Sequence, residues 1–345
     1  GGRRPMKLAL PTFWKHVITV LSGALGAQAL PLLAAPLITR MCTPAEMGAF
    51  SVWFGIIAVA AIGATLRLET AMVLDHAARE QRTCFRVVAW SATGAGLALT
   101  AGLATGRALD LPFLRQLSWL AILTIGLGAW LTATMQTTLA YATSHNAFGK
   151  AARAKVWGAS TIALGQVGLL YCGLGGAALL AGHLLGLAAG LIAARMLLNP
   201  PRAATALRLD DSQRRYLRRH EKFWRFSLPS NLLNLLVGQL PLFLIGARHG
   251  AMAAGLFALT QRVLGAPIAL LAASVLEVFK RQSVRDFQTL GNCEHAYRYT
   301  FKALLLLGLG PSLVLFAFSP ALFAWVFGEP WRAAGLALAA IALSD

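Results

Sequence analysis

Charged residues are scarce in this chain, and the 13 acidic residues are fewer than the 31 Lys and Arg residues. Only 13% of the 345 residues are charged, whereas soluble globular domains carry about 25%. Because 57% of the residues are hydrophobic, the chain cannot cover a water-facing surface with polar groups. This composition excludes a soluble enzyme and predicts a surface that faces lipid.

Motifs of catalysis and energy conversion are also missing. The four cysteines, Cys42, Cys84, Cys172 and Cys293, are scattered without C-x-x-C spacing, which argues against a metal or redox centre. The sequence holds no G-x-x-x-x-G-K-[ST] loop, so it encodes no ATP-driven motor. It also holds no D-x-D motif of a sugar-nucleotide transferase. We therefore expect no enzymatic activity, no cofactor and no metal.

Long apolar runs are what the sequence does have. The first, Val17–Ile38, has 22 residues, and as a helix it would span roughly 33 Å, enough for a bilayer core. No small-residue cleavage site follows it, so we expect it to stay as an anchor. The later runs are Gly48–Leu66, Val87–Thr105, Leu117–Ala140, Val156–Tyr171, Leu174–Leu198, Phe226–Ala247, Ala253–Phe279, Phe301–Phe318 and a short last one, Ala333–Leu343. The pattern predicts an all-α polytopic membrane protein.

Basic residues cluster between these runs and predict the orientation. If the N-terminus is cytoplasmic, 24 of the 31 Lys and Arg residues lie inside, five lie outside, and Arg67 and Arg262 lie in or near the membrane. Positive charge collects on the cytoplasmic face of membrane proteins. The split therefore places Arg215 inside and Arg115 outside. It also assigns the net charge of +18 to a lipid bilayer and not to nucleic acid.

A basic linker divides the chain. We predict an N-terminal lobe of six transmembrane helices (residues 1–198), a cytoplasmic basic linker (199–225) and a C-terminal lobe (226–345) of three full helices and a partial one. The linker favours an amphipathic helix on the anionic inner leaflet, with a cytoplasmic partner as the alternative. LPLL at 30–33 recurs as LPLF at 240–243, which indicates two pseudo-symmetric helical bundles. The short last run predicts that the second lobe is truncated.

Polar residues inside apolar runs are costly and mark candidate sites. The cavity candidates are Arg262, Gln261, Gln239, Asn234, Gln28 and Arg67, and the gating or structural candidates are Arg40, Glu69, Pro31 and Pro241. Arg262 lies about 13 Å below the outer end of its helix, so it needs a wet cavity, an anionic ligand or backbone carbonyls as partners.

For two pairs of these residues, a purely structural role is an alternative to a functional one. Arg67 and Glu69 fit either cavity residues or an ion pair at the inner end of the second helix, with snorkelling toward water as a variant. Pro31 and Pro241 fit either matched helix breaks along a transport path or packing kinks.

Three separated motifs resemble one known family. They are T-R-x-x-x-P-x-x-x-G from Thr39 to Gly48, R-x-E-x-A from Arg67 to Ala71, and FGEPWRAAG from Phe327 to Gly335. With the seventh and eighth helices, they resemble bacterial polysaccharide flippases of the multidrug/oligosaccharidyl-lipid/polysaccharide exporter superfamily.

The resemblance implies two six-helix lobes around a central cavity that opens alternately to either side of the bacterial inner membrane. It also implies an undecaprenyl-diphosphate-linked oligosaccharide as substrate and polysaccharide polymerase machinery as a further partner. One alternative is a drug/cation antiporter of the same superfamily, but only Glu69 and Glu277 bring a carboxylate near the membrane. A membrane polysaccharide polymerase, which needs a large outer loop, and a purely structural scaffold are more distant alternatives.

Overall fold

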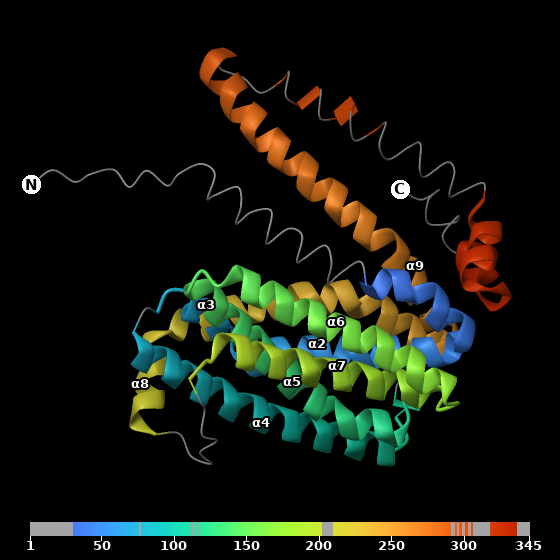
Figure 1. Ribbon diagram of the computed structural model, residues 1–345, viewed down its shortest axis with the longest axis horizontal. Helices are drawn as coiled ribbons and strands as arrows, with labels where there is room; N and C mark the ends of the chain where they lie inside the picture. The colour runs from blue at the N-terminus through green and yellow to red at the C-terminus, as the bar shows by residue number, and fades with distance from the viewer. Residues whose placement is uncertain are drawn as a thin grey trace, which may run out of the picture. The chain divides into compact units, whose positions relative to one another are not determined.

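The computed structural model describes residues 30–75, 77–111, 114–115, 117–201, 210–290, 294, 297–298, 301–302, 305 and 318–336. Within 266–290 the described side chains are those of Phe279 and Ser283. These residues are almost all helical, and no strand occurs among them (Figure 1). The elements are the helix Leu30–Met41, α2 (Pro44–Thr65), α3 (Leu68–Met72), α4 (Ala78–Ala108), α5 (Trp119–Ser144), α6 (Phe148–Tyr171), α7 (Gly176–Leu198), α8 (Asp211–Arg219), the π-helical segment η2 (Phe223–Ser227), α9 (Leu228–Leu290), the helix Phe318–Phe327 and the 3₁₀ turn η3 (Glu329–Trp331).

The expected class, an all-α polytopic membrane protein, is confirmed. In the described part of the chain, five segments are long and apolar enough to cross a membrane. They are Pro44–Thr65, Ala78–Ala108, Trp119–Ser144, Gly176–Leu198 and Phe223–Gly265. The first apolar run up to Ala29 and most of the run Phe301–Phe318 lie outside the described residues.

The start of α2 follows from its sequence. Thr43 is the N-cap and Pro44 the first helical residue, where a missing N–H costs nothing. Thr43 and Glu46 form a capping box, because the backbone N–H of Thr43 donates to Glu46 Oε2 at 2.8 Å and Glu46 N–H donates to Thr43 Oγ1 at 3.3 Å. Glu46 Oε1 also accepts from the backbone N–H of Gly176 at 2.8 Å, which joins the start of α2 to the start of α7.

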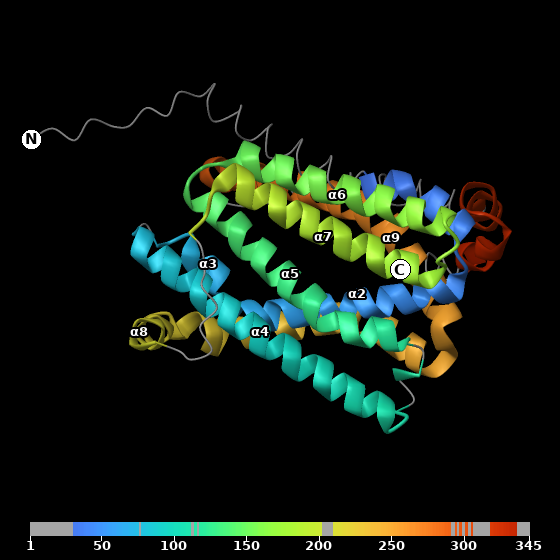
Figure 2. The ribbon, with the colours of Figure 1, turned by 60° about the horizontal axis from the view of Figure 1, so that its bottom comes forward.

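Glycine spacing on α7 explains the tight hairpin of α6 and α7. Gly182, Gly186 and Gly190 repeat every four residues and face α6. A Cβ at Gly186 would lie 2.1 Å from Ile162 Cγ1 and 2.9 Å from Gly158 O. Bare glycine faces let two membrane helices approach closely, and Figure 2 shows α6 and α7 running side by side.

Two compact units make up the chain, residues 1–254 and 255–345. Residues 226–254, expected to open the second lobe, belong to the first unit. The predicted boundaries at 198 and 225 stay a prediction. The backbone stays helical through Pro241, and the non-helical residue inside α9 is Gly250, with φ 82° and ψ 178°, so the gating role of Pro241 stays a prediction. Glycine adopts this backbone conformation at little steric cost. Pro241 lies within the helix, on an exposed face where its ring has room.

Packing within the second unit accounts for the residues of the FGEPWRAAG motif. Trp331 is fully buried, and Arg332 donates twice to Glu329, at 2.8 and 2.9 Å. That pairing lowers the pKa of the Glu329 carboxyl. A Cβ at Gly335 would lie 2.5 Å from Ser319 O, so only glycine fits against the start of the neighbouring helix. Residues 337–345, which include the end of the last predicted run, lie outside the described part.

Candidate functional site

A break between α2 and α3 positions the first candidate residues. Leu66 and Arg67 both adopt left-handed backbone, with φ 52° and 58°. This conformation costs roughly 1–2 kcal/mol for each L-residue with a side chain. Two threonines hold the turn: Arg67 N–H donates to Thr65 Oγ1 at 3.3 Å, and Thr70 Oγ1 donates to Arg67 O at 2.5 Å. Strain of this kind, overdetermined by its surroundings, is typical of functional sites.

The turn brings Arg67 and Glu69 into an ion pair. Arg67 Nη1 lies 2.9 Å from Glu69 Oε1, and the side chains are 23% and 12% exposed. The ion pair that the sequence left as one alternative is therefore confirmed. Arg67 Nε and Glu69 Oε2 are buried and have no hydrogen-bond partner in the described part of the chain. The buried Arg67 Nε–H is thus an unused donor within the pair.

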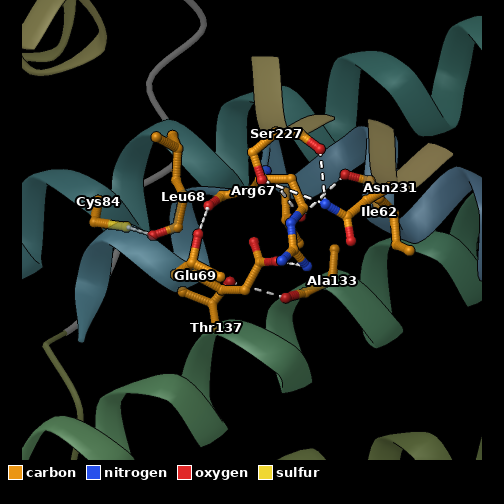
Figure 3. Close-up of polar contacts among 11 residues, drawn as sticks. Ile62, Arg67, Leu68, Glu69, Cys84, Ala133, Thr137, Ser227 and Asn231 are labelled. Carbon is orange, nitrogen blue, oxygen red and sulfur yellow. Dashed lines mark hydrogen bonds and ion pairs between the residues drawn. The ribbon is translucent and has the colours of Figure 1, made fainter. Parts of the chain in front are cut away.

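The start of α9 lies beside this pair. Figure 3 shows Arg67 and Glu69 with Thr137 of α5 and with Ser227 and Asn231 near the start of α9. Asn231 Nδ2 donates to Ser227 O at 2.7 Å, which fixes the amide of Asn231. The polar groups near Arg67 therefore come from three segments far apart in the sequence.

An apolar groove adjoins these polar groups. Its cavity measures about 340 Å³ and is lined by Ile56, Val59, Ala60, Gly63, Ala95, Leu99, Leu232 and Phe243. Gly63 is four residues before Arg67, and Leu232 directly follows Asn231. The polar residues and the groove, which is lined by apolar side chains of α2, α4 and α9, are therefore neighbours along the chain. The arrangement suits a ligand with one charged and one hydrocarbon part.

Gln239, a further cavity candidate, packs against α2. A Cβ at Gly55 would lie 2.9 Å from Gln239 Oε1 and 3.0 Å from a ring carbon of Phe243. Glycine at position 55 therefore makes room for the Gln239 amide. Asn234 and Pro241 are exposed on α9.

The remaining candidates are not among the residues that form the Arg67 pair or line the groove. Arg262, half-buried, and Gln261, exposed, belong to the second unit, where Thr260 Oγ1 donates to Ala334 O at 3.3 Å. Arg40 is exposed near the end of the helix Leu30–Met41, and Pro31 is half-buried near its start. Gln28 lies outside the described residues.

Some structural residues escaped the sequence analysis. The T-x-x-E motif at Thr43–Glu46 is a capping-box signal that is recognisable from the sequence alone. Asp75 is buried and accepts a hydrogen bond from Tyr216 Oη. The two residues are 141 positions apart, so no local sequence pattern predicts this contact. Gln166, conspicuous as a polar residue in a span, is a packing residue whose Nε2 donates to Leu179 O at 3.0 Å.

The fold is that of transporters of the MOP superfamily. A MOP superfamily transporter from Pyrococcus furiosus matches with a TM-score of 0.57 at 16% identity, covering 94% of this chain and 76% of that chain. An inward-facing multidrug resistance MATE family transporter matches with a TM-score of 0.62 at 18% identity, covering 91% and 76%. An outward-facing MATE family transporter gives 0.54 at 16% identity, covering 94% and 78%.

Sequence comparison then defines the family. A family model described as "Polysaccharide biosynthesis protein" matches residues 37–336. The chain belongs to this family, which confirms the resemblance to the polysaccharide branch of the superfamily. A comparison with curated proteins finds no significant match.

Proposed function

We propose that this protein is a flippase for undecaprenyl-diphosphate-linked oligosaccharides in surface polysaccharide assembly. Such a substrate carries a polar, anionic head group on a long hydrocarbon tail. The observation that carries the proposal is the junction of the Arg67 pair with the apolar groove on α2, α4 and α9. Family membership supports the polysaccharide part of the substrate.

Charge distinguishes this proposal from the antiporter alternative. A cation site needs an uncompensated carboxylate, and Glu69 is paired with Arg67. Arginine, with its forked guanidinium, suits a diphosphate. The archaeal transporter of this fold is described as having a binding pocket of reverse polarity that suggests a different function. We therefore use pocket charge to separate the two candidate substrate classes.

Gene deletion tests the reaction. Loss of a flippase should leave the lipid-linked oligosaccharide assembled but retained on the cytoplasmic side, where mass spectrometry of extracted lipids would detect its accumulation. A deletion strain with normal surface polysaccharide and no accumulated intermediate would contradict the proposal. Raised sensitivity to cationic drugs with intact polysaccharide would instead favour the antiporter.

Arg262 is the residue of the second unit that we propose contacts the diphosphate. In the deletion strain, Arg262→Ala should fail to restore surface polysaccharide at unchanged protein level. Arg262→Lys should restore it in part, because the charge is kept but the bidentate fork is lost. Gln261→Ala, a change at the exposed neighbour, is the milder comparison. Full complementation by Arg262→Ala would assign this arginine to structure only.

A further inference from the structure

Helix α8 of the linker is docked on the first bundle. Tyr216 Oη donates to Asp75 Oδ2 at 2.5 Å, and His220 Nε2 lies 3.4 Å from Asp75 Oδ1. Burial raises the pKa of the Tyr216 phenol, so the hydroxyl stays protonated and acts as the donor. Arg219 pairs with Glu80 of α4. Figures 1 and 2 both show α8 at the end of the bundle where α3 lies.

This docking changes the expectation for the linker. The sequence favours an amphipathic helix whose buried face meets lipid, and the helix is present. Its buried residues, Gln213, Tyr216 and His220, face protein instead. Its arginines Arg214, Arg215, Arg218 and Arg219 are all exposed. Any contact between α8 and an anion must therefore run through these arginines.

A polar groove opens between α8 and the first turns of α4. Its cavity of about 300 Å³ is lined by Arg79, Glu80, Thr83, Ser212, Arg215, Tyr216 and Arg219. This volume falls at the lower end of the roughly 300–1,000 Å³ typical of small-ligand sites. The Thr83 and Ser212 hydroxyls already donate to Arg79 O and Asp210 Oδ2, at 2.9 and 3.1 Å. The guanidinium groups are the remaining side-chain donors.

The charges of this groove are unbalanced. Glu80 is paired with Arg219, and no described carboxylate lies within ion-pair distance of Arg79 or Arg215. Arg79 is also the second residue of α4, whose N-cap, Ala77, supplies no side-chain cap. The first turn of a helix carries partial positive charge, so a cation placed there is unfavourable by itself. Bound anions, by contrast, are stabilised at helix N-termini.

We propose that this groove binds a phosphate-bearing anion between Arg79 of α4 and Arg215 of α8. Such a ligand would offset the repulsion of two guanidinium groups beside an uncapped helix end. Each guanidinium offers paired N–H donors that match phosphate oxygens. Since the groove joins α4 to the linker, the anion would also hold α8 in its docked position. The source is either the headgroup of an anionic phospholipid or a soluble phosphate compound.

Thermal unfolding of the full chain in lipid nanodiscs tests the site. One arm adds phosphatidylglycerol to phosphatidylcholine discs, and the other adds pyrophosphate to pure phosphatidylcholine discs. Tryptophan fluorescence reports the unfolding midpoint, whose rise with anion gives an apparent affinity. The test variant is R79Q/R215Q. The matched control is R214Q/R218Q, which removes the same charge from arginines of α8 that do not line the groove.

We expect R79Q/R215Q to bind roughly tenfold more weakly than R214Q/R218Q, because it removes charge-assisted bonds and not only diffuse attraction. R79K/R215K should bind with intermediate affinity. Stabilisation by phosphatidylglycerol alone identifies a headgroup, and stabilisation by pyrophosphate identifies a soluble ligand. Equal weakening in the two glutamine variants, or no stabilisation in either arm, would overturn the site. Since the readout is binding, it is independent of the proposed flippase activity.

Discussion

At the residue scale, Arg67 and Glu69 combine strain, partial burial and incomplete hydrogen bonding. A buried ion pair is weak support for stability by itself, because desolvation offsets much of the attraction. Arg67 Nε and Glu69 Oε2 are buried without hydrogen-bond partners among the described residues, so this pair contributes less to the free energy of unfolding than a fully bonded pair would. The pair therefore fits a site whose hydrogen bonds are completed by a ligand.

Separate truncations distinguish ligand binding from structure. Arg67→Ala should destabilise the protein by about 1–3 kcal/mol, reduced from the fully buried case by partial exposure, because Glu69 loses its partner. R67A/E69A should regain most of that stability, since no unpaired carboxylate remains. If Arg67 binds the diphosphate, the double variant stays unable to restore surface polysaccharide in the deletion strain. Thermal unfolding and complementation are the measurements, and a double variant that restores polysaccharide fully would assign the pair to folding.

At the element scale, close helix approach in the α6–α7 hairpin depends on glycine. Gly186→Ala should cost about 1–3 kcal/mol, because the added methyl meets Ile162 and the backbone of Gly158, which cannot move aside cheaply. Gly168→Ala is the matched control on α6, since a Cβ there meets nothing within 4 Å. Unfolding midpoints in detergent should separate the two variants. Equal unfolding midpoints would contradict the prediction and show that α6 and α7 rearrange to fit the extra methyl group without loss of stability.

Hydropathy predicted the apolar helices of the first unit, but not where they end, and the predicted span Val156–Tyr171 is not among the five described segments apolar enough to cross a membrane. The runs starting at Val87 and Val156 extend back to Ala78 and Phe148, because charged first turns continue as helix in water. The break at Leu66 and Arg67 carries no glycine or proline signal, so only tertiary context selects it. The polar candidates Arg67 and Glu69 were identified from their cost in a membrane. Their groove and the docking of Tyr216 on Asp75 depend on distant contacts, which periodicity does not encode.

At the scale of the whole molecule, the ends of the first unit can be sorted by contacts. Gln81 Nε2 donates to Ser144 Oγ at 3.3 Å and Tyr216 to Asp75, so residues 75–81, 144 and 216 share one end. Glu46 contacts Gly176, and a cavity of about 450 Å³ is lined at the other end by residues that include Ser118 and Ala251. The basic linker and the α6–α7 turn therefore lie at opposite ends.

This arrangement makes Cys172 a natural reporter of orientation. Cys172 is exposed in the α6–α7 turn, whereas Cys42 and Cys84 are buried. Burial raises the pKa of the Cys42 thiol to about 12, so at neutral pH it forms almost no thiolate to react with a maleimide. With Cys42, Cys84 and Cys293 replaced by alanine, a membrane-impermeant maleimide added to intact spheroplasts should label Cys172.

Arg215→Cys in a chain without other cysteines is the opposite probe. The excess of Lys and Arg on one side predicts that position 215 is cytoplasmic, so it should react only after permeabilisation. Both probes must agree, because positions 172 and 215 lie at opposite ends of one bundle and only one of them can face outward. Labelling of position 215 in intact spheroplasts, with Cys172 protected, would invert the topology. The groove between Arg79 and Arg215 would then face the outer leaflet, out of reach of cytoplasmic phosphates.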